Sequence, residues 1–333
     1  MKFLIFSDLH IHNYKQHNNE GDRLANCLRA LETMCDFAVQ NGMNILFAGD
    51  LFDTQKALLT EVVNDTLAKF IDIFVKYPEL KLYAITGNHD QNAKNLLDKP
   101  ADSALRHLSL VFPDNFILVD NKVIPLSDSI ILAGIPYYEY KEHFNIRLAE
   151  IASEVAAAKA GLEEEGKSPK AYLMIHQTAK ITGNDIIPYE TDPTDDYYKI
   201  FDHVYCGHIH TRGELTHNFT NVGNPMHRDL ADAGKEKGFY IRNLEKPEKG
   251  HRFIYLKGFP EFVVKTEGEE ISAEEANNFV VVQPDFHALS VSEEANVEEF
   301  NTSLESAQLM ENYWKNVDGK DKLLLSVGLE LLK

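Results

Sequence analysis

Short apolar runs alternate with longer segments of helical period along the first half of the chain. The apolar runs of strand length lie at residues 3–6, 45–48, 82–85, 129–135, 172–175 and 203–205. Between them, residues 23–41, 58–76 and 139–165 place apolar side chains at the three- and four-residue spacing of a helix face. Short buried strands that alternate with helices predict an α/β layered fold.

Two of the predicted helices carry further signals. Asp22 before residues 23–41 is a predicted N-cap, and Gly42 is predicted to end that helix. The helix at 58–76 has a broad apolar face, which Ile71 and Val75 widen beyond what one sheet needs. Core packing and a contact between two copies of the chain both account for that width.

The pattern changes near residues 258–260. Beyond this point, residues 262–265, 279–283 and 288–291 resemble strands, and residues 294–317 and 320–332 resemble helices. The sequence predicts three parts, at 1–257, 258–293 and 294–333. Leucines surround the last helix almost completely, so we expect it to be buried in its own domain or in a partner.

Composition narrows the class of protein. The 333 residues suggest one large domain and a smaller one, and the net charge of −19 argues against an ordinary nucleic-acid binder. No apolar run approaches the length of a membrane span, and the first apolar run is too short for a signal peptide. Cys27, Cys35 and Cys206 cannot form a disulfide framework, so the cytoplasm is the simplest compartment.

Polar side chains gather where five predicted strands end. The five clusters are DLH at 8–10, GD at 49–50, GNHD at 87–90, IH at 175–176 and GHIH at 207–210. Ligands bind at the carboxyl ends of strands in open α/β sheets, where tight glycine turns let side chains converge. Oxygen and nitrogen ligands without sulfur suit Mn²⁺, Fe or Zn²⁺. The inventory matches two cations about 3.5–4 Å apart that share one carboxylate.

Each cluster alone is weak, because DxH and GD are common in loops, whereas GNHD and CGHIH after a strand are more specific. The combination of all five carries the prediction. We interpret nine further histidines as surface or packing residues: His12, His17, His107, His143, His203, His217, His227, His251 and His287. Among these nine, His12 and His227 are the strongest candidates for another role. Cys206 occupies a buried strand position and is not expected to be a ligand.

These residues resemble the calcineurin-like metallophosphoesterases, and within them the SbcD-type DNA repair nucleases and their phage recombination relatives. GDLFDT at 49–54 and VGNPMHRDLADAGKEKGFYI at 222–241 support the narrower match. The motifs cover about residues 1–240. The resemblance implies a β-sandwich flanked by helices, followed by a small α/β capping domain and C-terminal helices.

The resemblance also implies a role for each site residue. Asp8, His10 and His210 would hold one metal, and Asn88, His176 and His208 would hold the other. Asp50 would bridge the two divalent ions, which are expected to be Mn²⁺, with Mg²⁺, Fe²⁺ or Zn²⁺ as alternatives. His89 would assist the leaving oxygen, and Asp90 would orient or tune His89. Asp53 departs from the histidine of the archaeal and eukaryotic branch.

The implied function is a Mn²⁺-dependent DNA nuclease with 3′–5′ exonuclease and endonuclease activity in repair or recombination. The implied partners are double- and single-stranded DNA, an SMC-like coiled-coil ATPase and a second copy of the chain, with no membrane. The location would be the cytoplasm, or the host cytoplasm for a phage protein. One alternative is a phosphoesterase for a small phosphodiester or a phosphoprotein, which would not need a second domain. The other is a silent scaffold, which would not need every ligand.

The distribution of charge along the chain makes DNA binding compatible with the acidic composition. Residues 261–333 carry 16 acidic and 5 basic side chains, whereas residues 201–260 carry nine basic and seven acidic ones. Most of the negative charge therefore lies outside the segment that supplies the predicted site. We expect this chain alone to bind DNA weakly, so that metals, a dimer and the ATPase supply the remaining affinity.

Overall fold

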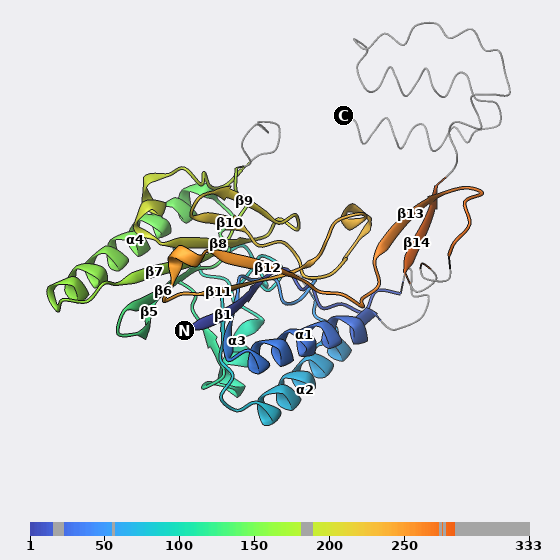
Figure 1. The fold of residues 1–333 in the computed structure, drawn as a ribbon, viewed down its shortest axis with the longest axis horizontal. Coiled ribbons are helices and arrows are strands. Elements are labelled where there is room, and N and C mark those ends of the chain that lie inside the picture. The colour runs from blue at the N-terminus through green and yellow to red at the C-terminus, as the bar shows by residue number, and fades with distance from the viewer. Residues whose placement is uncertain (16–22, 55–56, 181–188, 273–274, 276–277, 284–333) are drawn as a thin grey trace, which may run out of the picture. The chain divides into compact units, whose positions relative to one another are not determined.

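The computed structural model describes residues 1–15, 23–54, 57–180, 189–272, 275 and 278–283, and its main feature is a pair of six-stranded sheets (Figure 1). The first sheet has the order β12 (His251–Tyr255), β11 (Gly238–Asn243), β1 (Lys2–Phe6), β2 (Met43–Phe47), β3 (Leu82–Ala84) and β4 (Phe116–Leu118). The second has the order β5 (Lys122–Ser127), β6 (Ile130–Ile135), β7 (Lys170–His176), β8 (His203–Gly207), β10 (Phe219–Asn221) and β9 (Gly213–Thr216).

The central strands of each sheet are parallel, and both faces of these strands are buried. Strands β1 to β4 pair in parallel, as do β6, β7, β8 and β10. In β1, Phe3 and Ile5 join the apolar core between the sheets, whereas Leu4 and Phe6 pack against the helices. This double burial explains why the central strands are continuous apolar runs without polar alternation.

Helices cover the outer face of each sheet. Buried apolar residues of α1 (Arg23–Gln40), α2 (Thr60–Lys76) and α3 (Leu105–Val111) pack against the first sheet. Residues of α4 (Lys141–Glu164) pack against the second. The predicted α/β layered sandwich is therefore confirmed. None of the helices in the described part of the chain combines the length and apolar character that crossing a membrane requires.

The predicted elements of the first half agree with the structure to within a few residues. Gly42 has the left-handed φ of +63° that the predicted end of α1 needs, while Asp22 lies outside the described residues. The sequence missed α3, β4, β5, β9, β10 and β12. Several of these strands are half exposed or only three to six residues long, so their side chains follow no clear apolar pattern.

A small parallel pair follows the sandwich. Strands β13 (Phe262–Thr266) and β14 (Phe279–Gln283) pair in register, with the rings of Phe262 and Phe279 4.9 Å apart. These two strands were predicted. Residues 1–283 form one compact unit. The predicted strand at 288–291 and helices at 294–317 and 320–332 lie outside the described residues, and the boundaries at 257 and 293 stay predictions.

Candidate metal centre

The five polar clusters meet at one place, where strands of both sheets end. The clusters follow β1, β2 and β3 of the first sheet and end or follow β7 and β8 of the second. The backbone N–H of His208 donates to Asp8 Oδ1 across the sheets at 3.0 Å. The strand ends were expected at the edge of one open sheet, whereas the structure brings together the matching edges of two.

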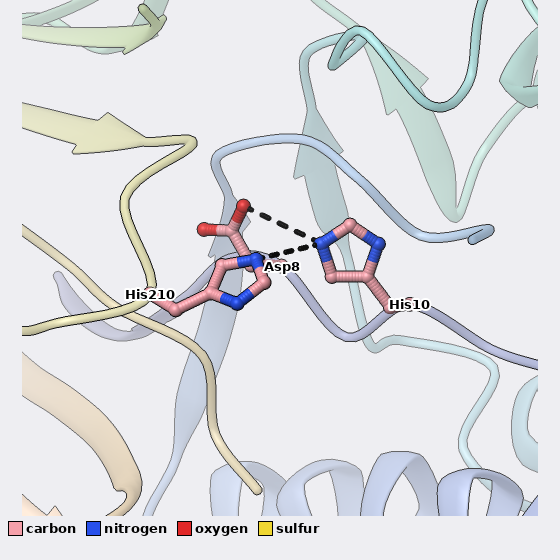
Figure 2. A group of neighbouring side chains, drawn as sticks. All are labelled: Asp8, His10 and His210. Carbon is pink, nitrogen blue, oxygen red and sulfur yellow. Dashed lines mark hydrogen bonds and ion pairs between the residues drawn. The ribbon is translucent and has the colours of Figure 1, made fainter. Parts of the chain in front are cut away.

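One group of possible ligands consists of Asp8, His10 and His210 (Figure 2). The Nε2 atoms of His10 and His210 are 3.0 Å apart, and His10 Nε2 is 3.9 Å from Asp8 Oδ1. At most one proton can lie between two ring nitrogens this close, so at least one lone pair faces the space that they share. The group joins a carboxylate to two imidazoles, which suits a divalent cation.

A second group is built around His176. Its Nε2 is 3.1 Å from both Asp50 Oδ2 and Asn88 Oδ1, and His208 Nδ1 is 3.0 Å from the same amide oxygen. The Nδ1 of His176 lies 2.7 Å from the carbonyl oxygen of Ala48. Because a carbonyl oxygen only accepts, Nδ1 carries the proton of the neutral ring and Nε2 keeps its lone pair for a ligand.

Asp50 lies between the two groups. Its Oδ2 is 3.1 Å from His176 Nε2 and 3.6 Å from His10 Nε2. Its Oδ1 accepts the backbone N–H of His89 at 2.8 Å. Asp50, His10 and His89 also form a third set of side chains close enough to hold an ion. The Asp50 carboxylate therefore reaches ligands of both groups at shorter distances than Asp8 does, and the resemblance gave Asp50 the bridging place.

The backbone is strained at these residues. Five described residues other than glycine have a left-handed φ, and four of them are Asp8 (55°), His10 (47°), Asp50 (62°) and His208 (88°). Such a conformation costs a non-glycine residue about 1–3 kcal/mol, and it persists only where the surroundings enforce it. Here the N–H of Asp8 donates to the carbonyl of Gly49 at 2.9 Å, and that of His10 to the carbonyl of Asp50 at 3.1 Å. The strain turns the side chains out of the strand direction and toward one another.

Two glycines of the motifs make room for this convergence. A Cβ on Gly87 would overlap the carboxylate of Asp50, and one on Gly207 would lie 2.7 Å from His176 Nδ1. Neither glycine has a left-handed φ. The sequence argument assigned them to tight turns, but their role in the structure is to let neighbouring segments approach closely.

The Asp90 carboxylate contacts the backbone of two loops at the site. Its carboxylate accepts the backbone N–H groups of Asp50 (2.8 Å), Leu51 (3.0 Å), Phe52 (3.1 Å) and Gly87 (3.0 Å). Burial and the charge of Asp50 raise the pKa of Asp90 to about 8. Asp90 therefore fastens the loop after β2 to the loop after β3. The Nδ1 atom of the His89 ring lies 2.5 Å from the carbonyl oxygen of Asp53.

The electrostatics of the protein alone favour cation binding. Burial lowers the pKa of His10 well below its usual value and that of His208 to about 3, so both rings are neutral and able to ligate. Burial opposes the charged form of His176, but Asp50 outweighs it and raises the pKa of His176 to about 9. The proton on His176 thus balances the charge of Asp50, and a bound cation would replace that proton.

Asp53 is a neighbour of the site to which the sequence assigned no role. Its Oδ1 is 3.4 Å from His10 Nδ1 and accepts from Arg228 Nε at 2.6 Å, and Tyr14 donates to Oδ2. Asp53 thus lies close behind the His10 ring, but no hydrogen bond joins it to Nδ1. The only sequence signal was its place three residues after Asp50 in GDLFD.

The remaining histidines stand apart from the two groups. His12 Nδ1 pairs with the carbonyl of His10, and His227 contacts the carbonyl of Lys235 (2.9 Å) and the N–H of Phe262 (3.1 Å). The metal-capable clusters of the described residues also leave out His107, His143, His203, His217 and His251. His17 and His287 lie outside the described residues.

Comparison with known proteins shows the family. The sequence profile of the calcineurin-like phosphoesterases matches residues 1–212, well over half of the chain. The chain belongs to the calcineurin-like phosphoesterases. Its class is therefore that of hydrolases that act on phosphoesters with divalent metal ions, and the two His/Asp groups are where this phosphoesterase could hold them.

Solved structures resemble this phosphoesterase at low sequence identity. The protein TT1561 of Thermus thermophilus is 14% identical with a TM-score of 0.45, and the match covers 76% of this chain and 98% of that one. A Staphylococcus aureus protein described as a candidate 5′-nucleotidase, in complex with α-ketoglutarate, is 12% identical with a TM-score of 0.38, covering 67% and 48%. The search against curated proteins gives no match.

Proposed function

We propose that this phosphoesterase is a divalent-metal-dependent DNA nuclease of SbcD type, a 3′–5′ exonuclease and endonuclease of repair or recombination. The observation that carries the proposal is the position of residues 222–241, one of the segments that support the narrower resemblance. The Ser7 hydroxyl donates to the carbonyl of Gly223 at 3.2 Å, and the N–H of Asn224 donates to the carbonyl of His210 at 3.3 Å. Arg228 bonds to Asp53 behind His10. Residues 222–241, which support the resemblance to DNA nucleases, thus lie next to the proposed metal ligands.

The proposed ligands follow the two groups. Asp8, His10 and His210 hold one cation, Asn88, His176 and His208 hold the other, and Asp50 serves both. Mn²⁺ is the proposed metal, because imidazole, carboxylate and amide donors without thiolate suit it. When bound, two such ions neutralise phosphate oxygens and lower the pKa of a water, which supplies hydroxide near neutral pH.

His89 is proposed to act on the leaving oxygen. The Asp53 carbonyl fixes its Nδ1 as the donor, so a protonated His89 carries a second proton on Nε2. When the P–O bond to the leaving oxygen breaks, that oxygen would take the Nε2 proton of His89. An imidazole that is only partly buried is suited to this step, because it can exchange protons with solvent between turnovers.

The proposed partners are DNA, a second copy of the chain and an SMC-like coiled-coil ATPase. Helix α2 buries Val62, Phe70, Ile73 and Phe74, but leaves Ile71 44% and Val75 78% exposed. Exposed apolar side chains on a helix whose other face is already packed favour the dimer over the core-packing alternative. The ATPase contact is proposed for residues 294–333, which lie outside the described residues.

Incubation of the metal-free protein with Mn²⁺ and labelled single- or double-stranded DNA, beside a small aryl phosphodiester, tests the proposal. We expect metal-dependent cleavage of DNA, loss of that activity in Asp50→Asn, and normal activity in the exposed-surface control Asp65→Asn. Hydrolysis of the small ester alone would support the small-substrate phosphoesterase. Hydrolysis of neither substrate by a metal-loaded protein would support the scaffold.

A further inference from the structure

Tyr137 is an aromatic side chain at the site that the ligand motifs do not include. It follows β6, and its backbone N–H donates to the carbonyl of Thr86 beyond β3 at 3.0 Å. Its ring stacks on that of His208, with centroids 5.6 Å apart and planes 29° apart. The ring is also 6.4 Å from that of His176, edge to face. A half-buried aromatic ring thus lies beside the proposed second cation group.

Three further contacts hold Tyr137 in place. Its carbonyl accepts from the side-chain amides of Gln91 at 2.9 Å and Asn95 at 2.8 Å. Its hydroxyl donates to Glu190 Oε1 at 3.2 Å, and Glu190 Oε2 accepts the N–H of Thr178 at 2.9 Å. Both ends of the residue are therefore fixed, and a ligand that stacks on the ring has little side-chain freedom to remove.

A hollow of about 350 Å³ opens beside this ring. The residues that line it include Tyr137, Asn88, Gln91 and Asn92, together with the charged Lys94 and Glu139. Lys94 Nζ is 2.6 Å from Glu139 Oε1, so the two charges offset each other. A nearly neutral hollow with one aromatic ring suits a flat heterocycle, which stacks on the ring.

We infer that this hollow is a nucleobase subsite, in which Tyr137 stacks on the base of the nucleotide next to the cleaved phosphate. This inference rests on the proposed nuclease function. Asn88 belongs both to the hollow and to the proposed cation group, so a phosphate at the cations leaves its own nucleotide or the next one beside Tyr137. Because every base has a stacking face, the subsite holds a strand without reading its sequence.

Single abasic substitutions test this subsite. The substrates are one single-stranded oligonucleotide and a series in which an abasic residue replaces each nucleotide in turn around the cleaved bond. KM and kcat are measured with Mn²⁺ for the wild-type protein, for Tyr137→Ala and Tyr137→Phe, and for the exposed-tyrosine control Tyr197→Ala. Elemental analysis of each variant records the bound metal.

In the wild-type protein, we expect one abasic position to raise KM about tenfold. The penalty at that position should disappear in Tyr137→Ala, because ring and base are the two halves of one contact, and should persist in Tyr137→Phe and Tyr197→Ala. A role confined to packing against His208 predicts the same abasic penalty in Tyr137→Ala as in the wild type, which would overturn the inference. The absence of any abasic penalty in the wild type would also overturn it. Absence of all DNA cleavage would instead overturn the nuclease function itself.

Discussion

The interior of the central strands and their carboxyl ends are built on opposite principles. Inside β1, Leu4 and Ile5 are fully buried among apolar side chains in regular parallel pairing. Three to six residues later, Asp8 and His10 are equally buried, but they are polar and the backbone is left-handed. The interior is where packing stabilises the fold, whereas the ends use strain and buried charge to place ligands. We therefore expect substitutions in the strand interior to lower stability, and substitutions at the strand ends to lower metal binding and turnover.

Asp50→Asn is expected to have the largest effect on function. The amide keeps the shape but removes the charge that both cation groups share, and each cation contributes several kcal/mol to catalysis. Phosphodiester hydrolysis should fall by about 10³-fold or more. Bound Mn²⁺ measured by elemental analysis should fall as well, and unchanged metal content would contradict the shared role of Asp50.

Leu4→Ala is the matched change in the strand interior. It removes a fully buried side chain and should lower the free energy of unfolding by about 2–5 kcal/mol, as measured by urea denaturation. The folded variant should keep its metal content and turnover. If it lost metal without losing stability, the separation between strand interior and strand end would be wrong.

His89→Asn is expected to have the next largest effect. The variant should bind the normal amount of Mn²⁺ and turn over about 10²–10⁴-fold more slowly, because only proton transfer to the leaving oxygen is removed. Turnover is best compared on substrates whose leaving groups differ in pKa. The loss should shrink for a nitrophenolate, which leaves without a proton. An equal loss on both substrates would count against His89 as the acid.

Two glycine substitutions compare a glycine that has close neighbours with a glycine that has none. Gly87→Ala places a methyl group against Asp50 and should weaken Mn²⁺ binding by at least about tenfold, as for other changes that disturb ligand support. Gly161→Ala, in helix α4 with open space around its Cα, should instead stabilise the protein by roughly 0.5–1 kcal/mol. Equal metal affinities in the two variants, measured by calorimetry, would contradict the role of Gly87.

The last predicted effect is on the pH dependence of metal binding. In the metal-free protein the pKa of His176 is raised to about 9, so the ring is protonated at neutral pH and must release that proton to bind a cation. Mn²⁺ affinity should therefore rise about tenfold per pH unit between pH 7 and 8 from this group and level off above about 9. An affinity that is flat across this range would show that His176 is neutral before metal arrives.

Much of the site could be predicted because strand ends are local features. The apolar runs located β1, β2, β3, β7 and β8, and the polar residues after them are the ones that the structure brings together. The pairing of two sheets followed from the family resemblance and not from periodicity, because sheet pairing depends on contacts between distant residues.

Other parts of the site could not be predicted from local pattern. The resemblance implied that Asp90 orients or tunes His89, but no local pattern indicated that its carboxylate binds the backbone after β2, some 40 residues away. Asp53 lies in the GDLFDT motif without an assigned role and Tyr137 lies in none of the five clusters, so only the folded chain shows what they contact. The left-handed backbone at Asp8 and His208 is enforced by tertiary hydrogen bonds, which no propensity scale contains.

The central claim is that five strand ends form one site for two cations. Calorimetric titration of the metal-free wild-type protein with Mn²⁺, with Asp50→Asn and Asp65→Asn measured in parallel, tests it most directly. The account predicts two Mn²⁺ ions per chain in the wild type and in Asp65→Asn, and fewer or weaker sites in Asp50→Asn. Binding of fewer than two ions by the wild-type protein, or the same two sites in Asp50→Asn, would contradict it.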